Sequence, residues 1–464
     1  KRHLAPTDLA VHRNVYDKVL KHADLWDLDS VHFLSKETLE KAGIDIRSTL
    51  PDGVSAILLT ARFPYLPKDA ARSQEIEGEF GSIAQLNLDF AELDTCRELE
   101  ALGYSALPKA RIDHKPFRTL CGIYEDEKTH IRTDVILTSA PFADKSCALL
   151  TEMAPKGDLR AMLERFAKIR GADLFGVASA QTVGELAGQL RELRKDEEIL
   201  LAVDKNTRFK PYDPEVTVQK RAIYDAQDIL PGAKSVLVLG MHYPEPATER
   251  VGQPPAEAVG PYVFTQYEVH RLIGHLGYAV ARMLNAMGYQ AVFTHNLTGA
   301  GSYVGSPRGP FHDATCNALE AVAAGIGKMA YNGSVETEEY GIHQRFIALV
   351  TDAPLAADKP QGGGADACAA CGKCLEACPT CALCAKALTE LDLGGEKVRY
   401  LPVDANRCDW ASKYALACEE GNVYLGNLSD VPCPDEITPE NLMDALRTQD
   451  CVFKYRPVTA WCAR

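Results

Sequence analysis

The chain has 464 residues, 46% of them hydrophobic, which is enough for two or three domains with substantial cores. Its formal net charge is −14 and its pI is near 5.4, so it lacks the basic surface that nucleic acids and anionic membranes attract. The longest apolar runs, near Ser235–Gly240 and Phe346–Val350, have the length of strands and not of membrane spans. We therefore expect neither a nucleic-acid partner nor a membrane span.

Two stretches of the chain, one beginning at Pro51 and one at Pro231, follow the same order of features. Each has a turn with Pro and Gly, a buried strand, a Phe-Pro or Tyr-Pro exit, a long helix that ends at Gly-Tyr, and a second short strand. The two stretches are 180 residues apart at the Pro and 185 apart at the Gly-Tyr pair. Chance similarity between two strand–helix units is the alternative, but the matched order favours an old duplication. In that case one copy can hold a ligand while the other serves as a scaffold.

The segments outside these strand–helix units are expected to alternate between helices, strands and loops. In chain order we expect a helix, a Gly turn and a strand at Leu159–Val177, a helix at Val183–Glu197, a charged loop at Asp204–Thr217, a long Gly/Ser/Pro loop at Gly299–Phe311, a helix at Asp313–Gly327, a strand at Arg345–Thr351, and a linker at Gln361–Ala365. Loops as long as Gly299–Phe311 are usually functional or mobile.

A cysteine run follows this linker, with the sequence ACAACGKCLEACPT. Cys368, Cys371, Cys374 and Cys378 have the spacing C-x2-C-x2-C-x3-C-P, in which three thiolates hold one iron–sulfur cube and the fourth ligates a second cube. A zinc site would have more widely separated pairs, and a disulfide framework does not suit a chain with this much core-forming sequence. Iron–sulfur thiolates favour a reducing compartment, so we expect a cytoplasmic location.

On these residues the chain resembles the corrinoid-dependent reductive dehalogenases. The resemblance runs from about Ile169 to Pro434 and rests on the ordered set GADLFGV, PGAKSVLVLGM, the Gly-Tyr helix end, AGIGKMAYNG, Arg345 ahead of LVTDAPLAADKP, and the cysteine run. It implies an α/β (α+β) fold in three parts. These are an N-terminal duplicate domain without cofactor at 1–155, a nitroreductase-like cobalamin-binding catalytic domain at 156–360, and a ferredoxin-like iron–sulfur domain with a tail at 361–464.

The resemblance implies that a carbon–halogen bond of an organohalide, such as a halogenated aromatic or phenol, is replaced by carbon–hydrogen. The implied cofactors are a base-off cobalamin, reduced to Co(I), and two 4Fe-4S clusters. The chain has no D-x-H-x-x-G segment that would offer a histidine to cobalt. It also has no dinucleotide or P-loop signature, so we expect electrons from an external low-potential donor, which is a ferredoxin, a flavodoxin or a separate reductase.

The reaction consumes a proton, and a tyrosine can supply it if a nearby cation lowers its pKa. Tyr267 lies near the position of the family's catalytic tyrosine, and Tyr262 and His270 are alternatives. Arg345 matches the family's active-site arginine, and Lys328 is a second candidate cation. Each has a structural alternative. Tyr267 could be a core tyrosine, Arg345 a solvent-facing charge at a strand end, and Lys328 a lysine favoured by a helix C-terminus.

Two further sets of residues are implied as cofactor contacts. Cobalamin needs close backbone approach, for which Gly299, Gly301 and Gly305 are candidates, and Asn296 is a further candidate contact. For the clusters, the resemblance implies one set of Cys368, Cys371, Cys374 and Cys433, and a second set of Cys378, Cys408 and Cys418. The family's second cysteine motif is incomplete here, so the eighth ligand is open, with Cys381 and Cys384 as candidates.

Two other functions are compatible with the same cysteines. An epoxyqueuosine reductase-like enzyme would use a corrinoid and two clusters on a modified tRNA base, but it should have a basic face. A plain iron–sulfur electron-transfer protein would have no corrinoid at all.

Overall fold

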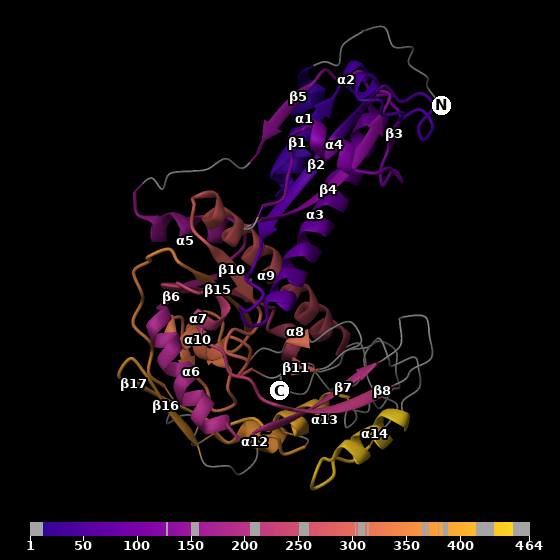
Figure 1. The fold of residues 1–464 in the computed structure, drawn as a ribbon. Helices are drawn as coiled ribbons and strands as arrows, with labels where there is room; N and C mark the ends of the chain where they lie inside the picture. The colour runs from indigo at the N-terminus through magenta and orange to yellow at the C-terminus, as the bar shows by residue number, and fades with distance from the viewer. Residues whose placement is uncertain are drawn as a thin grey trace. The chain divides into compact units, whose positions relative to one another are not determined.

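The computed structural model describes residues 13–126, 129–149, 157–204, 214–249, 259–301, 303–304, 311–312, 315–363, 368, 371–378, 380–383, 388–413 and 431–448. The fold is mixed α/β, and the named strands pair antiparallel (Figure 1). The chain divides into two compact units. Unit 1 comprises Lys1–Pro155 with Arg282–Gln290, and unit 2 comprises Lys156–Ala281 with Ala291–Arg464. In the described part of the chain, no helix has the length and apolarity needed to cross a bilayer.

Unit 1 contains a five-stranded sheet in the order β3-β4-β2-β1-β5. Its strands are β1 (Ser30–Leu34), β2 (Ser55–Pro64), β3 (Ala106–Leu107), β4 (Thr129–Thr138) and β5 (Lys145–Ala148). Its helices are α1 (Arg13–Leu25), α2 (Lys36–Lys41), α3 (Ser73–Ala101) and α4 (Lys115–Leu120). The long helix α3 packs against β2 and β4, because its buried residues recur on one face.

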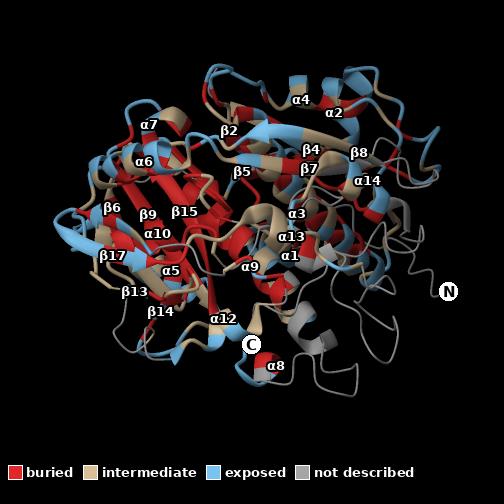
Figure 2. Ribbon diagram, turned by 90° about the horizontal axis from the view of Figure 1, so that it is seen from below, coloured by how far each residue is buried: buried red, intermediate tan, exposed pale blue. Residues whose placement is uncertain are grey.

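Unit 2 contains a four-stranded sheet in the order β10-β15-β9-β6. Its strands are β6 (Leu174–Ser179), β9 (Ser235–His242), β10 (Ala291–Thr294) and β15 (Gln344–Thr351). The helices before and between them are α5 (Leu159–Ile169), α6 (Ala180–Arg194), α7 (Ala226–Ile229), α8 (Pro246–Glu249), α9 (Val259–Ala286) and α10 (Ala318–Ala323), and the last five residues of α9 are counted with unit 1. Every residue of β15 is buried, as the red ribbon of Figure 2 shows, which explains its continuous apolar sequence.

Unit 2 also has four two-stranded ribbons and three helices near its cysteines. The ribbons are β7 (Glu198–Asp204) with β8 (Pro214–Lys220), β11 (Tyr303–Val304) with β12 (Phe311–His312), β13 (Lys328–Met329) with β14 (Val335–Glu336), and β16 (Thr389–Leu393) with β17 (Glu396–Tyr400). The helices are α12 (Lys373–Ala377), α13 (Ala405–Lys413) and α14 (Pro439–Thr448). Helix α14 packs against β8, and α13 contacts β7.

The two large sheets share a strand order and a set of local hydrogen bonds. In both, the first and second strands are neighbours, the long helix follows the second strand, and the fourth strand lies between the second and third. The second strand of each sheet begins with a serine. The Ser55 hydroxyl donates to the carbonyl oxygen of Ala140 at 2.5 Å, and the Ser235 hydroxyl donates to that of Ala353 at 2.8 Å.

The two long helices end in the same way. The backbone N–H of Tyr104 donates to the Leu99 carbonyl at 3.0 Å, and that of Tyr289 donates to the Leu284 carbonyl at 3.1 Å. The glycine before each tyrosine has a φ of +91° or +87°, a backbone conformation that favours glycine. The predicted helix ends at Gly-Tyr are therefore confirmed.

Several other sequence predictions differ from the structure in extent. The expected loop at Asp204–Thr217 ends in strand β8, since residues 214–220 pair with β7. The helix expected at Asp313–Gly327 is short, because Asn317 (φ +58°) and Gly325 (φ +72°) interrupt the helical backbone on either side of α10. The helices and strands at Leu159–Val177, Val183–Glu197 and Arg345–Thr351 are confirmed. The predicted domain boundary after residue 360 stays a prediction.

Candidate functional site

Three strands of unit 2 bring polar side chains together at one end of the sheet, where the strands begin or end. Strands β9 and β10 both run antiparallel to β15, so their carboxyl ends meet the start of β15. Tyr243 follows the end of β9, His295 follows the end of β10, and Arg345 is the second residue of β15. All three are less than 9% exposed, so this end of the sheet has a buried polar cluster.

Arg345 contacts the long helix α9. Its Nε donates a hydrogen bond of 2.6 Å to Oε1 of Gln266, and the two side chains are only 5% and 3% exposed. Arg345 is therefore not a solvent-facing charge at a strand end. The Nε2 of Gln266 is buried and makes no hydrogen bond of normal geometry to the described residues. The Tyr243 hydroxyl interacts with this amide, so the site supplies a polar neighbour of its own.

Tyr243 places a phenol beside this arginine. Burial raises the pKa of Tyr243 above its ordinary value, while the charge of Arg345 and the amide of Gln266 oppose the rise. The hydroxyl also lies 3.4 Å from the Ile342 carbonyl oxygen. The sequence reasoning missed this residue as a functional candidate and used it only as the Tyr-Pro exit of the second strand–helix unit. The combination of that exit with a matching Phe-Pro exit in the other unit was the available signal.

His270 and His295 lie side by side at the same end of the sheet. Their rings stack with centroids 4.0 Å apart and an interplanar angle of 27°. Asn296, the next residue along, is buried, and its Oδ1 accepts a hydrogen bond of 3.4 Å from the Gly301 backbone N–H. His270 and Asn296 were predicted from the sequence, whereas His295 was not.

The other predicted catalytic residues are less informative. Tyr267 follows Gln266 on α9, but its side chain and that of Tyr262 lie outside the described residues. Lys328 is exposed on the β13–β14 ribbon, where its Cα pairs with that of Glu336. Its role stays a prediction.

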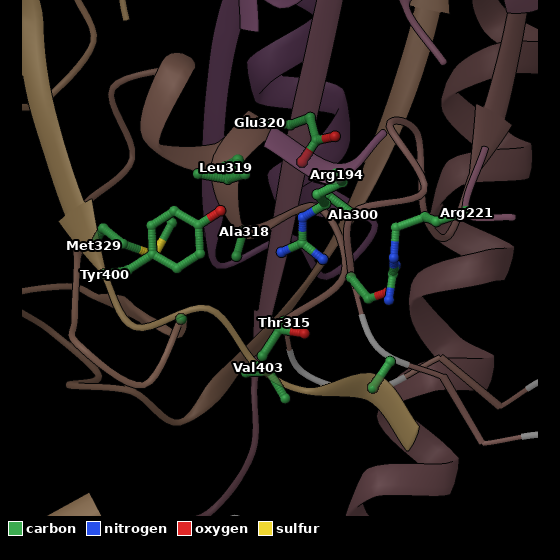
Figure 3. Close-up of a pocket in the computed structure, with 13 residues that line it drawn as sticks. Arg194, Arg221, Ala300, Thr315, Ala318, Leu319, Glu320, Met329, Tyr400 and Val403 are labelled. Atoms are coloured by element: carbon green, nitrogen blue, oxygen red, sulfur yellow. The ribbon is translucent and has the colours of Figure 1, made fainter. Parts of the chain in front are cut away.

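A small pocket lies elsewhere in unit 2, between the end of α6, the start of α10 and the loop at Gly301. Figure 3 shows the guanidinium of Arg194 between the Tyr400 ring and Arg221. Both arginines have partners: Glu197 Oε2 lies 3.1 Å from Arg194 and 2.9 Å from Arg221. The pocket is therefore not an open anion site.

The rest of the pocket wall is mostly apolar or backbone, with the hydroxyl of Thr315 and one buried acid. Burial raises the pKa of Glu320, whose Oε1 accepts a hydrogen bond of 3.0 Å from the Thr298 backbone N–H. The lining also includes Ala300, Gly301, Ala318, Leu319, Met329, Gly333, Val403 and Ala405. Such a wall suits the apolar face and amide fringe of a corrin in kind.

Two of the predicted glycines are required by the protein's own atoms. A Cβ at Gly299, whose φ is +74°, would lie 2.7 Å from the Ala222 carbonyl oxygen, and one at Gly301 would lie 2.5 Å from the Cys316 sulfur. Their carbonyls accept hydrogen bonds from Arg221 at 2.8 and 3.2 Å. Gly301 nevertheless lines the pocket, while Gly305 lies outside the described residues.

The cysteine run is described in part. Burial raises the pKa of the Cys374 thiol, and the nearby thiols of Cys368 and Cys371 add to the rise, so these three lie together. Cys384 and Cys418 lie outside the described residues. No group of three described His, Cys, Asp or Glu side chains converges closely enough for a single metal ion. A 4Fe-4S cube binds one thiolate at each iron, so its ligands stand further apart, and an all-thiolate donor set fits it.

Comparisons with known proteins give only distant likenesses. No family model matches the chain, and no curated protein sequence does. A structure of epoxyqueuosine reductase from Bacillus subtilis is 22% identical with a TM-score of 0.32, covering 48% of this chain and 52% of that one. A catabolic reductive dehalogenase in complex with 3-bromo-4-hydroxybenzoic acid is 14% identical with a TM-score of 0.32, covering 88% of this chain and 69% of that one.

A third structure, epoxyqueuosine reductase from Streptococcus thermophilus, is 18% identical with a TM-score of 0.32, covering 64% of this chain and 74% of that one. The chain thus spans about half the length of the Bacillus enzyme that it matches. With such low TM-scores, the function has to be argued from the residues themselves.

Proposed function

We propose that the chain is a cobalamin- and iron–sulfur-dependent reductive dehalogenase, which replaces a carbon–halogen bond of an organohalide by carbon–hydrogen. The observation that supports this most is the buried guanidinium of Arg345, bonded to Gln266 and next to the phenol of Tyr243. A buried cation attracts an anionic substrate group, and burial keeps the phenol of Tyr243 protonated, so that it holds a proton to donate. A halogenated phenol or a carboxylated aromatic has both the negative charge and the ring that such a site would hold.

The reaction needs two electrons and one proton, and it releases a halide ion. A bound corrinoid supplies the low-potential metal centre at which the carbon–halogen bond is broken. In the proposal, Arg345 orients the anionic end of the substrate, and a phenol donates the proton to the ring carbon. Tyr243 joins Tyr267, Tyr262 and His270 as a candidate for this donor.

The cofactors are assigned to the second and third parts of the chain. The cysteines from Cys368 onward would hold two 4Fe-4S clusters, which would supply redox centres between an external low-potential donor and the catalytic domain. Asn296, Gly299, Gly301, Gly305 and the pocket beside Gly301 contribute to corrinoid binding. The domains follow as a duplicate scaffold at 1–155, a catalytic domain at 156–360 and a ferredoxin-like domain at 361–464.

The duplication itself is supported by the shared strand order, the paired Ser–Ala hydrogen bonds and the paired helix ends of the two sheets. Agreement at these three separate features is more than a common α/β pattern requires. The N-terminal copy is thus proposed to be a relative of the catalytic core without a cofactor.

Anaerobic reconstitution tests the proposed function. The full chain is purified, supplied with iron, sulfide and cobalamin, and freed of unbound cofactor, and its visible spectrum and cofactor content are measured. We expect corrin bands together with an iron–sulfur shoulder, and halide release from a panel of halophenols with a low-potential reductant.

Three other outcomes would contradict it. Iron and sulfide without any corrinoid would leave a plain electron-transfer protein. Corrinoid uptake with turnover of epoxyqueuosine in tRNA, and no halide release, would assign the tRNA reaction instead. Uptake of neither iron nor corrinoid would remove the redox assignment.

A further inference from the structure

Cys381 lies outside the four-cysteine spacing but has an unusual backbone. Its φ is +55°, in the left-handed region that residues other than glycine rarely adopt. Such conformations are costly and cluster at functional sites. The Cys381 backbone N–H donates to the Cys378 carbonyl at 3.2 Å, so a tight turn closes the C-x-x-C pair CPTC. This is the spacing at which two thiolates commonly bind the same metal centre.

Arg407 holds this turn against the segment that contains Cys433. Its Nη1 donates to the Thr380 carbonyl oxygen at 3.0 Å and lies 3.8 Å from the sulfur of Cys433. Its Nη2 donates to the Asp435 carbonyl oxygen at 2.5 Å. One guanidinium therefore bridges the residue before Cys381 and the sulfur of Cys433.

Helix α13 brings a further cysteine to the same place. The Thr380 hydroxyl donates to the Arg407 carbonyl oxygen at 2.8 Å, and the Asp404 backbone N–H donates to the Ala382 carbonyl at 3.0 Å. Cys408 follows Arg407 directly, within the first turn of the helix. The backbone on both sides of Cys381 is therefore bonded to the helix turn that contains Cys408.

The segment containing Cys433 is itself fixed by packing. Trp410 of α13 is 2% exposed, and its Nε1 donates to the Val431 carbonyl oxygen at 3.0 Å. Cys433 packs against an apolar cluster formed by Leu200, Trp410, Leu442 and Ala445. A ligand held by a buried core stays in place whether or not a cofactor is bound.

We propose that Cys378, Cys381, Cys408 and Cys433 are the four ligands of one iron–sulfur cluster. Arg407 offsets part of the charge of four thiolates, and its N–H group faces the sulfur of Cys433, a contact of the kind that tunes cluster potentials. This assignment makes Cys381 a ligand and moves Cys433 away from Cys368, Cys371 and Cys374. It rests on the iron–sulfur part of the proposed function and not on the corrinoid or the substrate.

Iron content and electron paramagnetic resonance of the reduced full chain test the ligand role of Cys381. We expect Cys381→Ser to lose roughly half of the iron, which is one of two four-iron clusters, and to lose one of two reduced-cluster signals. Cys147→Ser, at a thiol of unit 1, is the matched control and should keep all of its iron. Full iron and an unchanged spectrum in Cys381→Ser would overturn the ligand role, and so would loss of both clusters.

A pair of double variants tests the grouping. If Cys381 and Cys433 serve one cluster, Cys381→Ser/Cys433→Ser should lose no more iron than either single variant. Cys374→Ser/Cys381→Ser should lose nearly all of it, because those two residues belong to different clusters. The opposite pattern would place Cys381 and Cys433 on different clusters and overturn the grouping. A wild-type chain that holds no iron would instead refute the iron–sulfur part of the proposed function.

Discussion

The two sheets place an arginine in the same register but surround it differently. Arg345 lies six residues before Thr351 and pairs with Met241 of β9, while Arg132 lies six residues before Thr138 and pairs with Ala61 of β2. Arg345 is buried, whereas Arg132 is exposed. The backbone frame is therefore common to both, and the environment of the arginine is what separates them.

The residues around each arginine explain the difference. In unit 2 the neighbours are Tyr243 and Gln266, whereas in unit 1 the corresponding positions are Phe63 and Gly81. Gly81 lies eighteen residues before Leu99 on α3, and Gln266 lies eighteen before Leu284 on α9. A Cβ at Gly81 would be 3.4 Å from both Arg132 Nη2 and Phe63 Cζ, so the positions match in space as well.

This comparison shows how little has to change to build a site. A phenol replaces a phenyl ring and an amide replaces a glycine, on strands and helices of the same order. In unit 1 the arginine then has neither a phenol nor an amide beside it at these two positions, while in unit 2 it is buried with both. Each of the following experiments tests one part of this contrast.

The largest effect is expected from removing the buried arginine. Arg345→Met keeps an unbranched apolar stem but removes the charge that orients the substrate, so we expect halide release to fall about 100- to 1,000-fold. Arg132→Met is the matched control in the other sheet and should leave the rate within about twofold, since exposed substitutions are usually mild. Turnover of a halophenol by the reconstituted chain measures both. Equal losses in the two variants would mean that the arginines are structural.

The phenol is tested by Tyr243→Phe, for which we expect a roughly 100-fold lower rate. Because the pKa of Tyr243 is raised, the phenol keeps its proton through neutral pH, and the wild-type rate should fall only above the ordinary pKa of tyrosine. The variant should lose that alkaline limb of the pH–rate profile. Tyr278→Phe, at a buried tyrosine of α9, is the control. A normal rate and profile in Tyr243→Phe, with a loss in Tyr267→Phe, would make Tyr267 the donor.

The sequence could predict what depends on neighbouring residues. The helix ends at Gly103 and Gly288 follow from a local backbone need, and the run from Gln344 to Thr351 could be recognised from its apolar residues. The cluster around Arg345 could not be predicted, because it depends on the pairing of β15 with β9 and on the rotation of α9. These contacts join parts of the chain that lie far apart in the sequence. The approach of Cys381 to Cys433 is a non-local contact of the same kind.

A second contrast lies where each long helix meets its sheet. Seven residues before the leucine at the helix end, unit 1 has Glu92 and unit 2 has Gly277. The Glu92 side chain is 1% exposed, and burial raises its pKa to about 7, with Asp134 adding to the rise and Lys109 opposing it. Lys109 bonds it twice, through its backbone N–H at 2.8 Å and its Nζ at 3.4 Å.

Glu92 should make the stability of unit 1 depend on pH. An unfolded glutamate loses its proton near 4.5, while the folded one keeps it until about 7. The stabilisation is thus complete below pH 4.5 and disappears as pH rises to 7, a change on the order of 3 kcal/mol. Glu92→Gln should show a smaller decline in thermal unfolding of the full chain between pH 5 and 8, because Glu79, whose pKa burial raises to about 8, keeps its own part of it. Glu100→Gln, at an exposed position of α3, should keep it, and a parallel decline in Glu92→Gln would assign the pH dependence to another group.

At the matching position, Gly277 lets α9 lie directly on its sheet. A Cβ there would be 2.9 Å from Ile347 Cδ1 and 3.1 Å from Phe293 Cβ. The methyl end of Ile347 can move, but Phe293 Cβ is fixed to a buried strand, so Gly277→Ala should cost about 1–3 kcal/mol of overpacking. A helix gains up to about 1 kcal/mol from Gly→Ala, which leaves a net loss. Gly188→Ala, at an exposed glycine of α6 with no atom within 4 Å, isolates that gain and should be stabilising. Denaturant unfolding measures the free energy of unfolding of both variants. If Gly277→Ala raises it as much as Gly188→Ala does, α9 can shift away from the sheet, and the tight packing that would hold Gln266 against Arg345 is absent.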